Sequence, residues 1–271
     1  GAEQEQLKEK VKSLKSKMDE LQEAVNQGQK ILDDLLLLVP APARADVPIG
    51  KDDSENKEVR KWGEIPKFDF KIKSHIELGE ARGWIDFERG VKIGGSRSYI
   101  LCADLARLEQ AVLRYTFDKL VSKGYRPLSI PVLVTEKAME GTGYFPIGRD
   151  QAYYIEKDQL ALVGTSEVSL TSYYSNEMLD GKNLPIRLFA QSSCFRREAG
   201  SYGKDTKGLY RVHQFQKVEQ VIIGPNDDKV SEQMHTELLT NAEEILQDFG
   251  LTYRVVYVCT GDLGQGQVRK H

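Results

Sequence analysis

The sequence predicts an α+β fold preceded by one long helix. Three observations support this prediction: a heptad repeat near the N-terminus, two amphipathic helical segments further on, and short runs of β-branched and aromatic residues between and after them. The chain has 271 residues, of which 40% are hydrophobic and 29% are charged. That apolar content is enough for one large domain with an appendage, and it excludes a disordered chain.

The N-terminal helix is predicted by apolar residues that are spaced alternately four and three positions apart. They are Leu7, Val11, Leu14, Met18, Leu21 and Val25. This is the a/d pattern of a coiled coil, and no second stretch of such regularity follows, so we expect the partner helix outside this sequence or in another molecule. Residues 1–38 contain six Lys against eight Asp and Glu, so a plain coiled-coil appendage explains the segment as well as an RNA-binding arm does.

The body begins near residue 40, where Pro40 and Pro42 end the helix and open a linker. Apolar periodicity predicts a helix over residues 104–123, with Asp104 as its cap, and another over residues 228–249 that Gly250 ends. We expect strands over residues 128–134, 186–191, 218–223 and 253–259. These strands are connected by hairpins more than they alternate with helices, which is typical of an α+β domain.

Charge, cysteines and hydropathy narrow the functional class. A net charge of -3 excludes a protein that coats nucleic acid over a broad surface, so any such contact is local. Cys102, Cys194 and Cys259 form no CxxC or Cys/His pattern, so we expect no protein-held metal and a reducing, cytoplasmic compartment. The longest apolar run, residues 35–39, is too short to cross a membrane, and we expect no membrane partner.

The residues richest in chemistry lie between positions 186 and 223. A strand running to Glu198, a loop over residues 199–209 and a return strand over residues 211–223 would place alternate side chains on one face. That face would carry Cys194, Arg196, Glu198, Arg211, His213, Phe215, Lys217 and Glu219. Guanidinium groups bind phosphate, an aromatic ring stacks on a base, and a carboxylate accepts from an amine, so the face suits a nucleotide. From spacing alone, cross-strand ion pairs on a solvated sheet are the favoured alternative.

Specific motifs in this stretch resemble the second signature motif of class II aminoacyl-tRNA synthetases, and in detail the seryl family. They are Phe195-Arg196-Arg197-Glu198, the run GLYRVHQF at residues 208–215, and Lys217-Val218-Glu219. Further matches occur in the expected order at residues 47–53, 59–64, 96–97, 141–143 and 165–167, and Pro131 matches the first class II motif. The resemblance covers almost the whole chain. It implies a class II antiparallel sheet flanked by helices, incomplete at the C-terminus, after a long coiled-coil helix.

The resemblance also implies domains and site residues. Residues 1–39 would be the second helix of a tRNA-binding arm, and residues 40–271 a catalytic domain with motifs 1 and 2 but not motif 3. The implied ATP-binding residues are Arg196, Arg197, Glu198, Val212 and Phe215, with Arg196 as the catalytic residue. The implied serine-binding residues are Thr165, Ser166, Glu167, Arg196 and Glu219. Pro131 would lie at a dimer interface, and tRNA would contact Lys8, Lys10, Lys12, Lys15 and Lys17.

The implied reaction is ATP-dependent activation of L-serine to seryl-adenylate, followed by transfer of serine to tRNA(Ser) by a homodimer. Mg²⁺ is expected on the ATP phosphates, and no protein nucleophile is needed, so Cys194 and His213 receive no catalytic role. We expect the chain to be truncated at both ends and its activity to be weak without the third motif. Two other readings are a catalytically silent paralogue that dimerises or binds RNA, and a ligase that charges a carrier protein with an amino acid.

Overall fold

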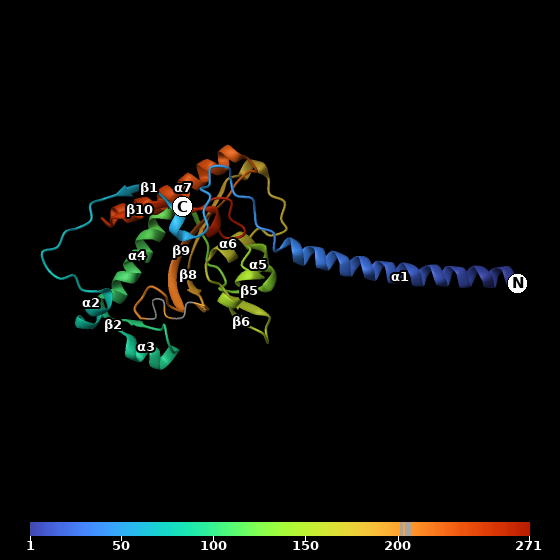
Figure 1. The fold of residues 1–271 in the computed structure, drawn as a ribbon, viewed down its shortest axis with the longest axis horizontal. Helices are drawn as coiled ribbons and strands as arrows, with labels where there is room; N and C mark the ends of the chain where they lie inside the picture. Colours follow the sequence, from blue (N-terminus) through green and yellow to red (C-terminus); the bar gives the residue numbers. More distant parts are fainter. Residues whose placement is uncertain (201–202, 204–206) are drawn as a thin grey trace.

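The computed structural model describes residues 1–200, 203 and 207–271, and it places one long helix outside a body of mixed helices and strands (Figure 1). The helices are α1 (Ala2–Leu36), α2 (His75–Ala81), α3 (Phe87–Gly94), α4 (Ala103–Ser122), α5 (Glu136–Gly141), α6 (Glu167–Ser172) and α7 (Asp228–Asp248). Short 3-10 turns are η1 (Asp53–Glu55), η2 (Ile147–Gln151), η3 (Gly181–Asn183) and η4 (Thr260–Asp262). The strands are β1 (Lys57–Trp62), β2 (Ile85–Asp86), β3 (Ile100–Leu101), β4 (Arg126–Pro127), β5 (Leu133–Thr135), β6 (Tyr153–Ile155), β7 (Leu160–Leu162), β8 (Ile186–Phe195), β9 (Gln214–Ile223) and β10 (Tyr253–Tyr257).

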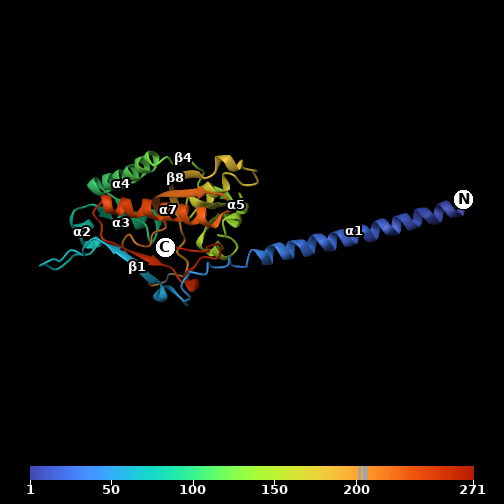
Figure 2. The same cartoon turned by 90° about the horizontal axis from the view of Figure 1, so that it is seen from above.

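The helix α1 confirms the helix predicted from the heptad repeat and projects away from the body in both views (Figures 1 and 2). None of its 35 residues is buried, and the exposed fractions of the six heptad side chains run from 53% for Leu14 to 68% for Met18. At its base, Gln265 Nε2 donates to Leu37 O over 2.9 Å. The apolar stripe is thus open along its length, and a partner helix remains a prediction.

The sheet that positions the candidate site has the strand order β4-β8-β9. β8 and β9 are antiparallel from the pair Ile186 and Ile223 to the pair Phe195 and Gln214, whereas β4 pairs with β8 in parallel. Leu188 faces Leu170 of α6, while the next residue, Phe189, packs on the other side against Leu120 of α4. This alternation follows from the two-residue period of a strand. Helices therefore cover both faces near the Ile186 end, and most polar side chains of the sheet lie toward the other end.

A second three-stranded sheet, β5-β7-β6, lies beside the first. Its core contains Val134, Met139, Phe145, Ala152, Ala161, Val163 and Val168. The chain leaves β7 at Leu162 and enters α6 at Glu167. Phe195 N, at the end of β8, donates to Val163 O over 2.8 Å. That bond brings residues 164–167 next to the end of β8 and the beginning of β9.

The two long body helices match the predicted ranges to within two residues, with one difference at a cap. Asp104 does not cap α4: it lies in the first turn and pairs with Arg107 at 3.3 Å. The N-cap is Cys102, because its amide donates to Trp84 O over 2.7 Å and so fixes where extended backbone ends. In α7 the cap is Asp227, whose carboxylate accepts from Val230 N.

Two predicted strands, over residues 128–134 and 253–259, differ from the observed ones. The predicted strand 128–134 is wrong over residues 128–132, because the chain pairs with β8 only at Arg126 and Pro127 and with β7 only from Leu133. Pro127 and Pro131 have no N–H to donate to a ladder, which favours this break. The predicted strand 253–259 ends at Tyr257, and its partner is β1, a strand that the sequence patterns do not predict.

The ladder around the predicted loop is also shorter than expected. β8 ends at Phe195 and β9 begins at Gln214, so Arg196, Glu198 and Arg211 lie beyond the paired region. Glu198 has a φ of 53°, in the left-handed region, so strand alternation does not extend to it. The prediction that these side chains share one face by strand alternation is therefore wrong. Contacts with other residues, and not the period of a strand, place these side chains.

Candidate active site

Thr165 is the centre of a polar cluster between α6 and β9. Its side chain is only 1% exposed, and its hydroxyl donates to Glu219 Oε2 over 2.9 Å. Lys217 Nζ donates to the same hydroxyl oxygen over 2.5 Å and also pairs with Glu219 Oε2. Because Lys217 and Glu219 are two residues apart on β9, they point to the same side of the sheet. The cluster joins a hydroxyl, an ammonium and a carboxylate within hydrogen-bonding distance.

A second carboxylate stands beside this cluster at the first residue of α6. Glu167 accepts a hydrogen bond from Tyr144 OH over 3.4 Å. Burial by the surrounding protein and repulsion from Glu219 raise the pKa of Glu167 above its ordinary value, and Lys217 opposes this shift. Burial, followed by the charge of Glu167, also raises the pKa of Tyr144. A carboxylate whose ionisation is disfavoured in this way, as that of Glu167 is, provides a site that a small cation, such as an ammonium group, would stabilise.

The cluster adjoins a cavity of about 610 Å³ at the end of β8. Arg196, Glu198 and Arg211 line it, together with Tyr144 and Gly164. Arg196 Nε donates to Gly164 O over 3.3 Å, and Arg211 Nη1 lies 3.5 Å from Glu198 Oε2. Two guanidinium groups at one cavity suit a ligand with phosphate or carboxylate oxygens.

Phe215 provides an aromatic ring next to this cavity. The Arg196 guanidinium carbon lies 5.2 Å from the ring centroid of Phe215, within the range of a cation–π contact. Beyond the ladder, the chain that follows β8 is connected to the chain that precedes β9, because Arg196 N donates to His213 O over 3.0 Å. Val212 itself is buried, with 6% of its surface exposed. Its side chain therefore belongs to the core.

Arg197 points away from the 610 Å³ cavity. Its Nη1 donates to Asp150 O over 3.2 Å and its amide donates to Gln151 O over 2.9 Å. The side chain lines a separate cavity of about 390 Å³ that includes Tyr153 and Glu156. This placement agrees with the opposite orientations expected for Arg196 and Arg197.

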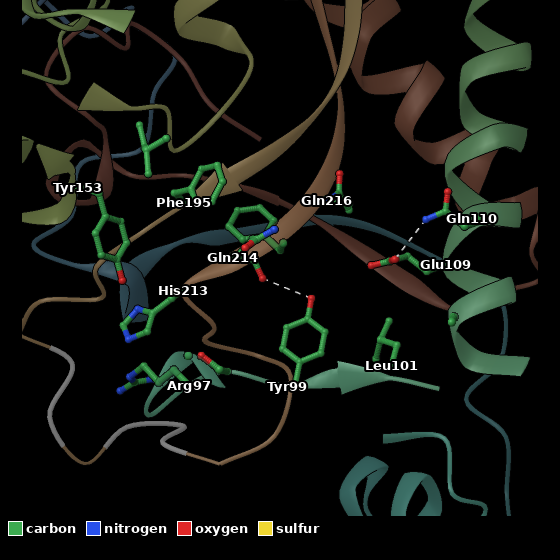
Figure 3. A pocket seen from close by; sticks show the side chains of 15 residues that line it. Arg97, Tyr99, Leu101, Glu109, Gln110, Tyr153, Phe195, His213, Gln214 and Gln216 are labelled. Atoms are coloured by element: carbon green, nitrogen blue, oxygen red, sulfur yellow. Dashed lines mark hydrogen bonds between the residues drawn. The ribbon is translucent and has the colours of Figure 1, made fainter. Parts of the chain in front are cut away.

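A third cavity, of about 590 Å³, lies at the beginning of β9, where Phe195 and Phe215 also line it (Figure 3). Gln214 and Gln216 line it from β9, and Glu109 and Gln110 line it from α4. In Figure 3, Arg97 and Tyr99 face His213 and Gln214 across one wall of the cavity.

Within residues 1–200, 203 and 207–271, no group of three or more His, Cys, Asp and Glu side chains has a geometry that could hold a metal ion. In the same residues, no helix is long and apolar enough to span a membrane.

The comparisons with known proteins agree with this geometry. A family model described as tRNA synthetase class II core domain (G, H, P, S and T) matches residues 153–270. The sequence is 44% identical over 264 residues to a serine–tRNA ligase of Hydrogenobaculum sp. and 42% identical over 262 residues to that of Deinococcus radiodurans. Both matches cover 97% of this chain and 62% of the relative. The chain is thus similar to seryl-tRNA synthetases over almost its whole length.

Solved structures of the same family show the same fold. The seryl-tRNA synthetase of Pyrococcus horikoshii complexed with ATP superposes with a TM-score of 0.87 at 37% identity, over 92% of this chain and 60% of that one. The cytoplasmic serine–tRNA ligase of Naegleria fowleri in complex with AMP gives 0.85 at 32% identity, over 92% and 59%. The body is therefore a class II synthetase core, and the chain spans about 62% of the length of the curated relatives that it matches first.

Within this synthetase core, the structure brings together most of the residues implied by the sequence motifs. Arg196 and Glu198 line one cavity, and Thr165, Glu167 and Glu219 form the polar cluster beside it. Ser166 is different: it is fully buried, and its hydroxyl lies 2.6 Å from that of Ser192, so its side chain faces the core. Pro131 lies elsewhere, where its carbonyl accepts from Ser169. The five arm lysines are on α1, which extends away from the body (Figure 1).

Three residues at the site are absent from the set implied by the motifs. Tyr144 and Arg211 line the cavity, and Lys217 holds the Thr165 hydroxyl. The spacing along the return strand predicts Lys217 and Arg211 on the polar face, but the motifs assign neither of them a ligand, and Arg211 reaches the cavity from beyond the ladder. Tyr144 directly follows Gly143 in the GTG run, but no sequence spacing connects it to Glu167.

Proposed function

We propose that the chain carries the active site of a serine–tRNA ligase, which activates L-serine with ATP and transfers it to tRNA(Ser). The observation that supports this most directly is that two kinds of site lie next to each other. The cavity with Arg196 and Arg211 suits polyphosphate, and the cluster of Thr165, Glu167 and Glu219 suits a small molecule with a hydroxyl and an ammonium group. The family relatives named as serine–tRNA ligases support the same substrates.

In the first step, a carboxylate oxygen of serine attacks the α-phosphorus of ATP. A bond forms between that oxygen and phosphorus, the bond from phosphorus to the bridging oxygen of the β-phosphate breaks, and pyrophosphate leaves with the electron pair. Arg196 would hold the serine carboxylate and α-phosphate together and stabilise the charge that develops on the phosphoryl oxygens. Glu198 would accept from the adenine amine, and Phe215 would stack on the base. Arg197, Ser166 and Val212 would contribute through their backbone atoms or through the residues next to them in the chain.

In the second step, a hydroxyl of the terminal ribose of tRNA attacks the carbonyl carbon of seryl-adenylate, and AMP leaves. ATP would enter as its magnesium complex, because Mg²⁺ binds readily to phosphate oxygens and needs few protein ligands. The protein would act through position and charge.

The serine specificity follows from hydrogen bonding at Thr165 and Glu219. A buried donor or acceptor that loses its partner costs about 1–3 kcal/mol, so an amino acid without the hydroxyl would be rejected by a large factor. The raised pKa of Glu167 fits a carboxylate that becomes fully ionised when the substrate ammonium binds.

We further propose that residues 1–39 act as a tRNA-binding arm and residues 40–271 as the catalytic domain. The arm carries Lys8, Lys10, Lys12, Lys15 and Lys17 on an exposed helix, which could meet tRNA phosphates. A homodimer, with Pro131 near its interface, and a cytoplasmic location complete the proposal. The three free cysteines agree with a reducing compartment.

The test is serine-dependent exchange of pyrophosphate into ATP, measured on the 271-residue chain and on a form extended to the length of its relatives. We expect exchange in the extended form and little in the shorter one. A form that binds ATP but catalyses no serine-dependent exchange would contradict the proposal and favour a silent paralogue. Exchange with transfer to a carrier protein and not to tRNA would favour a carrier-protein ligase.

A further inference from the structure

Residues 208–213 form a limb of the chain that carries Arg211 to the 610 Å³ cavity, and this limb lies outside the ladder between β8 and β9. β9 begins only at Gln214, so residues 208–213 make no ladder contacts with β8. Arg211 nevertheless lines the 610 Å³ cavity and reaches Glu198. A backbone segment without regular pairing needs other hydrogen-bond partners to stay in one conformation. The contacts of this limb therefore determine where the Arg211 side chain can point.

Arg97 and Tyr99 supply three of these contacts. Arg97 Nη1 donates to Arg211 O over 3.1 Å, and Arg97 O accepts from His213 N over 3.3 Å. Tyr99 OH donates to Gln214 O over 3.3 Å, as the dashed line in Figure 3 shows. Arg97 has a φ of 60°, a conformation that costs a non-glycine residue energy and persists only where its surroundings enforce it. The bonds at Arg211 and just after it thus come from one short segment.

His75, the first residue of α2, holds the beginning of the same limb. Its Nε2 accepts from Leu209 N over 3.0 Å, and its ring meets the edge of Tyr210 with the centroids 4.7 Å apart. Gly208 has a φ of 89°, and a Cβ at that position would lie 2.3 Å from His75 Nε2. Only glycine permits so close an approach. The Ser74 capping box fixes the helix end on which His75 stands.

We propose that Arg97 and His75 are positioning residues of the ATP side of the active site. Their hydrogen bonds to the backbone within residues 208–214 fix the backbone of Arg211 and so direct its guanidinium to Glu198 and the cavity. This inference rests on the proposed function, because it assigns Arg211 to the polyphosphate. Small displacements of such groups reduce rates strongly, with about a hundredfold loss for a shift near 1 Å. Neither Arg97 nor His75 contacts the polar cluster around Thr165, so serine binding should be independent of them.

The experiment compares Arg97→Met with Arg211→Met and with the double variant, in the extended form that catalyses exchange. We expect Arg97→Met to raise the KM for ATP about tenfold, the size expected when one bond from a charged group is lost, with the KM for serine unchanged. Because Arg97 acts through Arg211, the double variant should lose no more than Arg211→Met alone. Arg89→Met is the matched control, since Arg89 is exposed and pairs only locally with Asp86.

A second pair of variants keeps the test decisive if Arg97→Met unfolds. His75→Gln retains an acceptor for Leu209 N and should keep the wild-type KM for ATP, whereas His75→Phe keeps a ring beside Tyr210 without the acceptor and should raise it. Additive effects of Arg97 and Arg211, or equal losses for ATP and serine, would overturn the inference. Absence of ATP binding by the unsubstituted protein would instead overturn the proposed function and, with it, this inference.

Discussion

The hydroxyl of Thr165 donates to Glu219 Oε2 over 2.9 Å and connects the loop before α6 to the middle of β9. Lys217 donates to the same hydroxyl, so the Thr165 oxygen is held by two charged groups on one strand. The three side chains are fixed relative to one another before any ligand arrives. Such preorganisation lowers the entropy that a small substrate loses on binding.

Replacing Thr165 by Val should therefore weaken serine binding more than ATP binding. The substitution keeps the shape of the side chain but leaves Glu219 without a donor and Lys217 without an acceptor. We expect the KM for serine to rise about tenfold to a hundredfold and that for ATP to change little. Steady-state exchange kinetics measure both, with Thr116→Val at a half-buried position of α4 as control, since the Thr116 hydroxyl donates to Val112 O of the same helix. Equal changes in both constants would exclude a specific role in serine recognition.

Arg196→Ala should remove serine-dependent exchange. The guanidinium stands between the Gly164 carbonyl and the Phe215 ring, where it can reach both the carboxylate and the phosphate of the reacting pair. Loss of one such electrostatic stabiliser typically costs about a hundredfold to a thousandfold in rate. Single-turnover adenylate formation measures the effect, and the exposed Arg254 provides an Arg→Ala control. An unchanged rate in Arg196→Ala would remove this residue from its assigned role.

Substituting the five arm lysines should weaken tRNA binding and reduce its salt dependence. Lys8, Lys10, Lys12, Lys15 and Lys17 are exposed on α1, and each contact with a phosphate adds about 0.7–0.9 to the slope of log affinity against log salt. Their replacement by Gln should leave amino acid activation unchanged, because α1 lies outside the body (Figure 2). Filter binding over a range of salt concentrations measures the slope, and a Lys→Arg version that keeps the charge should behave as wild type. Parallel losses of binding and activation would contradict the arm assignment.

Glu237 should contribute to stability in a pH-dependent way. Its two carboxylate oxygens accept from Arg187 Nε and Nη2, each over 2.7 Å, and Tyr125 OH also donates to it. The hydrogen bonds from Arg187 lower the pKa of Glu237, and partial burial opposes this. Because the pKa is lower in the folded state, the stabilisation is present above the unfolded-state pKa and is lost as the pH falls through the folded value.

Glu237→Gln should accordingly lower the free energy of unfolding at pH 7 by about 1–2 kcal/mol, after allowing for solvent screening of a partly exposed pair. The difference from wild type should shrink as the pH is lowered toward 3. Urea unfolding at several pH values measures it, with the exposed Glu88→Gln as control. A difference that stays constant with pH would show that packing, and not the ionised carboxylate, explains the effect.

Much of the fold could be predicted from local patterns. The heptad spacing predicts α1, and apolar periodicity with a terminal glycine predicts α4 and α7, because helices are stabilised by contacts within one stretch of chain. The pairing of β1 with β10 could not be predicted in this way, since almost two hundred residues separate the strands. The break over residues 128–132 was equally hidden, because the β-branched composition there indicates a strand.

By itself, the sequence determined the three long helices, the two central strands and, through its motifs, the resemblance to seryl-tRNA synthetases and most residues of the candidate site. Only the tertiary structure decided how those residues meet. Strand alternation could not place Arg196, Glu198 and Arg211, because all three lie beyond the ladder and depend on contacts with distant segments. It also could not show that Ser166 faces the core while Thr165 faces Glu219. The physical reason is that non-local packing, and not local backbone preference, sets the direction of each of these side chains.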